Sequence, residues 1–265
     1  MAFLDYVYRF FFKIFRGKGF GLGIFNRIHR AYETYVQPKF VTVNGCILFL
    51  PSHDEGVSDS LRMEDTWEPE LTREFERVIK TGMTVLDVGA NVGYHTLLAS
   101  RLVGKNGHVL SFEPDPSNLA LLEKNIQANR CANVQVFPFA VGAAERTVEL
   151  NLCSSTAGAH STAYVPEGGH DKITVRMVRL DDFLNPELQP NVVKMDIEGG
   201  EAQALEGMAR ILADSRLTTV FIECSPPILA KLGSSPSNLL KKLERVGFSS
   251  RQLDHLNWLC TRDRQ

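Results

Sequence analysis

The 265-residue chain is long enough for one large α/β domain or two small ones. Its 44% hydrophobic and 23% charged residues are typical of a globular protein, and it contains no run of about 18 apolar residues that would predict a membrane span. The formal net charge of −2, without a basic stripe in the central region, argues against nucleic acid as a partner.

Five cysteines are present, an odd number, and their spacing matches no zinc motif. We therefore predict no metal site from the cysteines. Buried free thiols are typical of a reducing compartment, so we expect a cytoplasmic protein. The five are Cys46, Cys131, Cys153, Cys224 and Cys260.

The first fifteen residues are rich in aromatic side chains interrupted by Asp5, Arg9 and Lys13. At about 100° per residue the charged side chains fall on one side, which predicts an amphipathic helix. Its aromatic face either packs on its own domain or a second subunit, or lies in a membrane interface and associates the protein peripherally with the membrane. Both interpretations stay open, and the sequence defines no oligomeric state. We assign residues 1–36 to this helix and a linker.

Residues 37–66 form a lead-in to the main domain. Residues 40–43 and 46–50 are β-type sequences joined by Asn44-Gly45, and Asn-Gly favours the tight turn of a β-hairpin. Residues 51–65 are predicted to be a polar loop.

The main domain, residues 67–265, begins with a predicted helix at residues 70–80. From Thr84 onward, short apolar runs alternate with helical stretches. Long crossovers between strands predict a mostly parallel sheet with helices on both faces. The predicted strands are 85–86, 108–112, 134–137, 192–195 and 218–222; the predicted helices are 93–102, 116–128, 202–212 and 237–246.

Two segments depart from this alternation. Residues 147–151 and 172–178 have strand patterns around a loop, residues 154–170, that is rich in Gly, Ser and His. Residues 248–253 and 258–261 predict a C-terminal hairpin that adds an antiparallel strand to the parallel sheet.

The segment from Val85 to Thr96 is the most informative motif. It predicts a buried strand ending in Asp87, a tight turn through Gly89 and a helix that starts near Gly93. The glycine spacing differs from the G-x-G-x-x-G of dinucleotide sites. Asp87 would repel a pyrophosphate but suits the ammonium of an amino acid, which indicates S-adenosyl-L-methionine as the cofactor.

A second acidic residue, Glu113, ends the next predicted strand. A carboxylate at this place accepts hydrogen bonds from ribose hydroxyls, in NAD sites as well as in other adenosine sites. Glu113 alone therefore does not distinguish a site for S-adenosylmethionine from a site for NAD. The two motifs together, in this order, predict a site for an adenosyl cofactor.

Further carboxylates end the last two predicted strands. Asp196, Glu198 and Glu201 follow residues 192–195, and Glu223 follows residues 218–222. Glu201 is adequately explained as a helix cap. The other strand-end acids are expected to converge with Asp87 and Glu113 on one edge of the sheet.

These motifs resemble the FkbM-type methyltransferases from about Trp67 to Pro226. The resemblance implies a class I (Rossmann-like) methyltransferase fold and methyl transfer, typically to a hydroxyl of a glycan or small natural product. It also implies which residues bind the methionine end, the ribose and the adenine of the cofactor. The residues implied for the methionine end are Asp87, Gly89, Ala90, Asn91 and Gly93. Glu113 is implied for the ribose, and Ala140 or its neighbours for the adenine. The matching motifs are Asp87–Gly93, Phe112-Glu113-Pro114, Leu180–Leu184 and Lys194–Glu201.

For catalysis we expect Asp196 to be the general base or a metal ligand, Glu198 to cooperate with it, and His160 to be the second candidate. His95 is interpreted as a neighbour of the cofactor turn, and His170 as a second histidine of the covering loop.

The alternatives are a nucleotide oxidoreductase, a cofactor-binding protein without catalysis, and methylation of nitrogen or nucleic acid. Ser225-Pro226-Pro227 resembles an amino-methyltransferase motif, but Ile228 replaces its aromatic residue and the motif follows the wrong strand.

Overall fold

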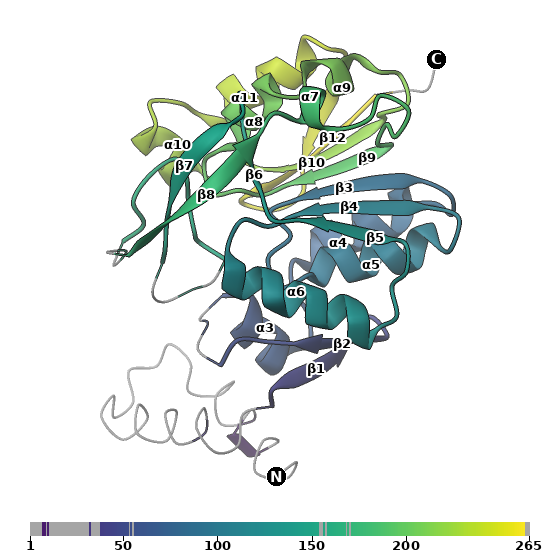
Figure 1. The fold of residues 1–265 in the computed structure, drawn as a ribbon, viewed down its shortest axis with the longest axis vertical. Coiled ribbons are helices and arrows are strands. Elements are labelled where there is room, and N and C mark those ends of the chain that lie inside the picture. The colour runs from purple at the N-terminus through teal and green to yellow at the C-terminus, as the bar shows by residue number, and fades with distance from the viewer. Residues whose placement is uncertain are drawn as a thin grey trace.

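A seven-stranded sheet forms the centre of the molecule in the computed structural model (Figure 1). The structure describes residues 38–262 except 53, 55, 154, 155, 157, 168 and 170, and in addition Val7, Tyr8, Phe10 and Tyr32. Five neighbouring strands are parallel, and β12 lies antiparallel between β10 and β11. In spatial order the strands are β11 (Ser249–Gln252), β12 (Asn257–Thr261), β10 (Thr219–Glu223), β9 (Val192–Met195), β3 (Thr84–Val88), β4 (His108–Phe112) and β5 (Val134–Phe137).

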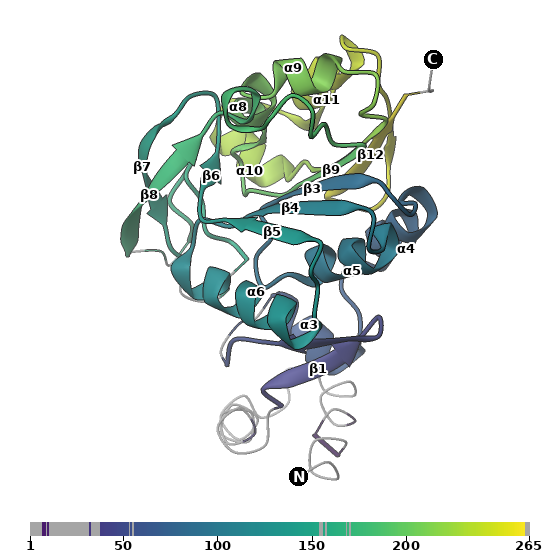
Figure 2. The ribbon, with the colours of Figure 1, turned by 45° about the vertical axis from the view of Figure 1, so that its right-hand side comes forward.

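Helices cover both faces of this sheet (Figure 2). Because side chains alternate along a strand, Val85 of β3 packs in one apolar cluster with helices α4 and α5, while Leu86 and Val88 pack in the other with the C-terminal helices. The first cluster is covered by α4 (Pro69–Val78) and α5 (Tyr94–Val103), and the second by α7 (Leu180–Phe183), α8 (Glu201–Glu206), α9 (Ala209–Ala213), α10 (Pro226–Lys231) and α11 (Pro236–Glu244).

This architecture confirms the class I methyltransferase fold implied by the resemblance. The parallel strands, the helices on both faces and the antiparallel C-terminal hairpin are all present. In such a sheet, ligands bind beyond the carboxyl ends of the parallel strands.

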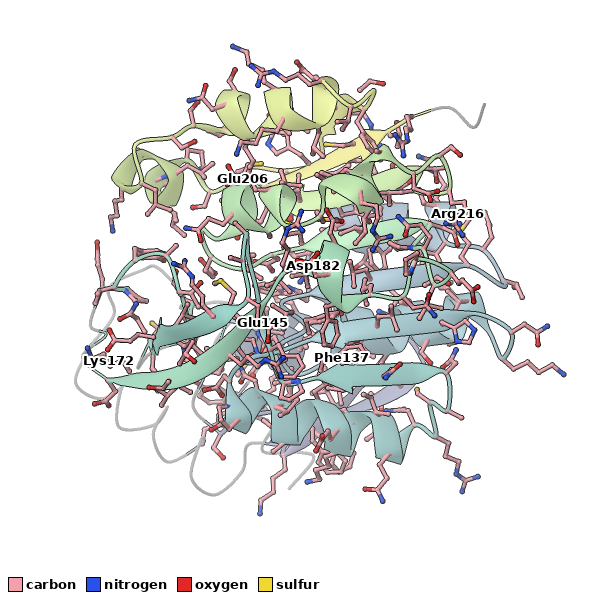
Figure 3. The ribbon with its side chains drawn as sticks, turned by 45° about the horizontal axis from the view of Figure 1, so that its top comes forward. Phe137, Glu145, Lys172, Asp182, Glu206 and Arg216 are labelled. Atoms are coloured by element: carbon pink, nitrogen blue, oxygen red, sulfur yellow. The ribbon has the colours of Figure 1, made fainter. Side chains whose placement is uncertain are left out.

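A second, three-stranded sheet adjoins the first and contains both strands predicted in the irregular region. Its order is β6 (Ala140–Val141), β8 (Lys172–Val178) and β7 (Arg146–Asn151). Phe137, at the end of β5, packs edge-to-face on Phe183 of α7 with ring centroids 5.1 Å apart; Phe137 is labelled in Figure 3.

The predicted hairpin is present as β1 (Phe40–Val43) and β2 (Cys46–Phe49), paired antiparallel around Asn44 and Gly45, whose φ angles of 50° and 73° suit the turn. It lies against α6 (Pro116–Ala128). Apolar side chains and the amide groups of Asn125 and Asn129 join the hairpin to α6 and its end.

The prediction of a loop over residues 51–65 is wrong, because the segment contains helix α3 (Val57–Glu64). Asp54 accepts hydrogen bonds from the backbone and hydroxyl of Ser58. Val57 and Leu61, one helical turn apart, bury their side chains in the cluster beneath the hairpin. The polar composition concealed this short apolar stripe.

The single helix predicted over residues 202–212 is also wrong, because the chain forms α8 and α9 with a break at Gly207 and Met208. A Cβ at Gly207 would lie 2.0 Å from the carbonyl oxygen of Gly142, so the backbones touch here. The Asp181 carboxylate accepts hydrogen bonds from the backbone nitrogens of Arg210 and Ile211, which caps the N-terminus of a separate helix, α9. Helix α10 was not predicted.

The expected N-terminal amphipathic helix lies outside the described residues except for Val7, Tyr8 and Phe10. Tyr8 stacks on Tyr32 with ring centroids 3.8 Å apart and packs near Met63 of α3. The membrane or partner contact of this segment, and the division of the chain at residues 36 and 66, stay predictions.

Among the described helices, none has the length and apolar character that crossing a bilayer requires. All five cysteines are free thiols.

Asn125→Ala is expected to destabilise the domain by about 2–4 kcal/mol. The buried Asn125 side chain accepts from Phe49 N and donates to the carbonyl oxygens of Phe49 and Val92, so it connects the hairpin to the chain just before α5. Removing it leaves these buried groups without partners. Chemical denaturation measures the free energy of unfolding.

Asn129→Ala is the matched control. Its side chain makes the same pair of bonds to the backbone of Ile47, an exposed residue where water replaces them. Equal losses for the two variants would contradict the importance of the buried connection.

Candidate active site

A cavity opens at the carboxyl edge of the large sheet. The ends of β3, β4, β9 and β10 border it. The described residues of the covering segment between β7 and β8 line another part, namely Thr156, Gly158, Ala159, His160 and Thr162. Of the residues predicted to bind the cofactor, Gly89, Ala90, Asn91, Glu113 and Ala140 line this cavity. All three predicted catalytic residues, Asp196, Glu198 and His160, also line it.

The turn after β3 brings bare backbone to the cavity. Gly89 has φ +82°, and a Cβ there would lie 1.8 Å from the carbonyl oxygen of Asp196, so only glycine fits. Gly93 serves packing instead, because its own Cβ would lie 2.6 Å from Leu122. Asn91 has φ +50°, and its buried Oδ1 has no hydrogen-bond partner among the described residues.

Glu113 is held at the cavity wall by the backbone. Its two carboxylate oxygens accept from Asn91 N at 2.7 Å and from Asp115 N at 2.9 Å. Burial raises the pKa of Glu113 to about 7, although these hydrogen bonds oppose the shift. Each oxygen keeps a second lone pair for a ligand hydroxyl.

The cavity wall beyond Glu113 is apolar. Phe139, Ala140, Val141 and Leu150 line it, from β6, β7 and the residue before β6. A flat apolar ring system such as adenine suits this wall.

The structure places Asp87 away from the cavity, contrary to the expectation that it faces the cofactor. Asp87 is buried and accepts from Thr96 Oγ1 at 2.6 Å, and its Oδ1 lies 3.8 Å from Lys194 Nζ. The physical reason is that Asp87 lies within strand β3 and points under helix α5, whereas Glu113 and Asp196 follow the last residues of their strands. Lys194 therefore already matches the charge of Asp87.

Lys194 also connects Asp87 to the cavity. Its buried Nζ donates to the carbonyl oxygen of Gly89 at 3.0 Å and lies 3.3 Å from Asp196 Oδ2. The carboxylates of Asp196 and Asp87 raise the pKa of Lys194 against the effect of burial, so the side chain stays charged. One cation thus fixes the turns after β3 and β9 relative to each other.

Three carboxylates gather where β9 and β10 end. One oxygen each from Asp196, Glu198 and Glu223 lie within 4.8 Å of one another, close enough to surround a cation. Burial, and then the neighbouring charge of Asp196, raise the pKa of Glu198 to about 8 and that of Glu223 well above its usual value. The Asp196 side chain is 29% exposed, so its carboxylate is partly accessible from the cavity.

His160 lies in the covering segment with its Nδ1 accepting from Cys153 N at 2.9 Å. Burial lowers its pKa, which favours the neutral ring. With Nδ1 as an acceptor, the neutral ring carries its proton on Nε2. This tautomer makes His160 a hydrogen-bond donor to a ligand, which disagrees with a role as general base. His170 lies outside the described residues.

Two acidic motifs of the sequence are structural. Glu201 was expected to cap a helix at the surface, but it is buried, and its Oε1 accepts from the backbone nitrogens of Ile197 and Gly199 in the turn after β9. Asp181 caps helix α9.

Sequence reasoning missed Trp67 and Glu68, which line the cavity from the start of α4. The sequence indicates a functional role for Glu68 only weakly, because Glu68 precedes a proline that begins a helix and belongs to no recognised motif. His95, interpreted only as a neighbour, also lines the cavity.

The fold and the cavity define a class I methyltransferase. The family model for the methyltransferase FkbM domain matches residues 87–250, and the chain therefore belongs to this family. The family uses S-adenosylmethionine as its cofactor.

Among characterised proteins, the chain is similar to hexuronic acid methyltransferase AglP of Haloferax volcanii, with 28% identity over 166 residues. The match covers 62% of each protein, so the chain spans less than two thirds of this relative. Two solved structures are also similar. The methyltransferase FkbM of Methylobacillus flagellatus KT has 17% identity and a TM-score of 0.48, over 76% of this chain and 52% of that one. A SAM-dependent methyltransferase of Aquifex aeolicus has 16% identity and a TM-score of 0.43, over 76% and 90%.

The residues of the cavity fit this cofactor. The turn at Gly89 leaves no room for a Cβ, the buried Oδ1 of Asn91 lacks a partner among the described residues, and Glu113 has lone pairs free for ribose hydroxyls. The apolar wall at Ala140 completes the surface that an adenosine requires.

Lys194→Met is expected to destabilise the unliganded protein by about 3–5 kcal/mol, because it leaves the buried Asp87 carboxylate without its cation. Adding Asp87→Asn should restore part of the loss by removing the unpaired charge. Chemical denaturation of both variants measures the effect. Lys172→Met, which breaks an exposed pair with Glu149, is the control and should cost less than about 1 kcal/mol. A single variant as stable as the control would contradict the role of Lys194.

Proposed function

We propose that this enzyme transfers a methyl group to a hydroxyl oxygen of a glycan or small natural product. The observation that carries the proposal is the position of Asp196, which lines the cofactor cavity directly after β9 with a partly accessible carboxylate. A carboxylate at this place can accept the proton that the acceptor hydroxyl loses.

The similarity to a hexuronic acid methyltransferase supports a sugar acceptor. The cavity also suits a hydroxyl better than an anion. Lys194 is the one lysine or arginine among the lining residues that the structure describes, and it is already engaged by Asp87 and Asp196. Acceptors rich in phosphate are therefore disfavoured, which speaks against nucleic acid.

S-adenosylmethionine supplies the methyl group from its sulfonium centre. The backbone of Gly89, Ala90 and Asn91 and the carboxylate of Glu113 orient the bound molecule. Orientation of this kind is worth about 7–11 kcal/mol of the barrier. Asp196 holds the acceptor hydroxyl and takes its proton, which adds about 10²–10⁴-fold.

Glu198 and Glu223 assist Asp196 through their protonation. With their pKa values raised, both hold protons near neutral pH and can donate hydrogen bonds toward Asp196. His160 donates from Nε2 to the acceptor. Asp87 acts indirectly, by fixing Lys194 beside Gly89.

Two alternatives remain distinguishable. Methylation of nitrogen finds little support at Ser225-Pro226-Pro227, because this segment opens α10 and its residues are absent from the described cavity wall. A protein that binds the cofactor without catalysis would show affinity without turnover.

The proposed function is tested by incubating the enzyme with methyl-labelled cofactor and neutral or acidic oligosaccharides. A methyl ether of a sugar hydroxyl is stable to mild alkali, whereas a methyl ester of a uronic acid is hydrolysed. Alkali-stable label in the oligosaccharide is the expected result. Label released by alkali, or taken up by RNA or by amines, would contradict transfer to a hydroxyl.

Glu113→Ala is expected to weaken binding of S-adenosylhomocysteine about 10- to 100-fold, because charge-assisted hydrogen bonds to the ribose are lost. Isothermal titration measures the dissociation constant, and thermal melting checks the fold. Glu145→Ala, at an exposed pair with Arg176, is the control and should leave affinity unchanged. Equal affinities in both variants would move the ribose contact elsewhere.

Asp196→Asn is expected to reduce single-turnover methyl transfer by at least about 100-fold while leaving cofactor affinity nearly intact, because an amide accepts no proton. A variant with normal chemistry and a lowered melting temperature would assign Asp196 a purely structural role. If wild-type activity requires Mg²⁺ and vanishes with a chelator, Asp196 acts as a metal ligand instead.

A further inference from the structure

Two buried polar atoms face each other at one end of the cavity without hydrogen-bond partners among the described residues. They are Oε2 of Glu68 and Nε2 of His95, 3.8 Å apart. The two side chains are only 14% and 5% exposed, and both line the cavity. Unpaired buried polar atoms are costly, so a pair of them at a cavity wall indicates a ligand group.

The architecture places this pair at the end of the cavity opposite the ribose site. Glu68 Oε1 accepts from Asn257 Nδ2 at 2.7 Å, and Asn257 lies opposite Glu223 in the pairing of β12 with β10. Glu113 instead follows β4, and strands β3 and β9 lie between β4 and β10. His95 is the second residue of α5, directly after the glycine turn. The pair therefore lies beyond the turn on the side away from adenosine.

The charge of Glu68 has no matched cation. His95 is the one basic side chain among the described residues within 4.0 Å of its carboxylate. Burial and the nearby Lys194 hold the pKa of His95 well below its usual value, so the imidazole is neutral. Burial and the charge of Asp196 raise the pKa of Glu68 to about 7, although the hydrogen bond from Asn257 opposes the shift.

The carboxylate assigned from the sequence to the cofactor's ammonium group does not face the cavity, although its Oδ1 also lacks a hydrogen-bond partner among the described residues. Asp87 is matched by Lys194 and does not border the cavity. Asp196 also lies beside Lys194. Among the described carboxylates of the cavity wall, Glu68 thus combines a position beside the glycine turn with an unpaired oxygen.

We propose that Glu68 binds the α-ammonium group of the methionine part of S-adenosylmethionine, and that His95, through Nε2, positions the same amino-acid end. The ammonium supplies the missing cation to Glu68 and the donor to its free oxygen. The inference rests on the cofactor site of the proposed function but not on the identity of the acceptor.

Two truncated cofactors test this assignment by isothermal titration. S-adenosylhomocysteine carries the amino-acid end, and 5′-methylthioadenosine lacks it while keeping the adenosine and the sulfur. Glu68→Gln should weaken S-adenosylhomocysteine about 10- to 100-fold and change the affinity for methylthioadenosine less than about threefold. Glu113→Ala, by contrast, should weaken both ligands.

Two further variants keep the test independent of folding defects. Glu68→Asp retains the charge but withdraws it by one methylene, and an intermediate loss restricted to S-adenosylhomocysteine is expected. Glu70→Gln, on the same helix at an exposed pair with Arg73, should change neither affinity.

The outcomes separate the two proposals. If wild-type protein binds neither ligand, the cofactor site itself is misplaced and the inference falls with it. If wild type binds both, but Glu68→Gln weakens both equally or neither, the ammonium contact of Glu68 is wrong while the cofactor site stands. Unchanged affinity together with a raised KM for the acceptor would assign Glu68 to the acceptor instead.

Discussion

The buried ammonium of Lys194 is the contact on which the site depends. In the pairing of β3 with β9, Lys194 lies opposite Asp87, and its Nζ reaches the carbonyl oxygen of Gly89 and the carboxylate of Asp196. The backbone after β9 approaches Gly89 so closely that no Cβ fits between them. Ionic and steric contacts therefore fix the same two turns, and these turns carry the surface facing the cofactor and the residue assigned to the acceptor proton.

This arrangement concentrates carboxylates around a single lysine, and their protonation limits the resulting charge. Burial raises the pKa of Glu198 to about 8 and that of Glu223 further, so both are largely neutral at pH 7. A strongly negative cavity would hold the sulfonium substrate tightly but would lose this attraction as the methyl group leaves, which raises the barrier. Carboxyl groups that keep their protons supply hydrogen bonds without that penalty.

The sequence predicted the sheet well because its strands are short apolar runs separated by long helices, and it predicted the hairpin because Asn44-Gly45 favours one turn type. It did not distinguish Asp87 from Glu113 and Asp196, since motif position alone does not tell whether a residue is inside a strand or just beyond it. Asp87 is the fourth residue of β3 and points to a helix, whereas the other two follow their strands. Glu68 escaped prediction because its placement depends on Asn257, 189 residues away.

In the proposed site, the strand ends supply the cofactor contacts and Asp196, and a loop of the small sheet completes the wall of the cavity. The strand ends and the helix openings beside them surround the proposed adenosine and methionine positions, while the covering segment lies between β7 and β8 of the small sheet. Ser161 ties this segment to the acidic turn, because its hydroxyl donates to the carbonyl oxygen of Glu198. Changes in the covering segment that keep the Ser161 contact can alter the cavity wall without disturbing Lys194 or Gly89. A rigid sheet edge with a variable covering loop is how one fold serves many acceptors.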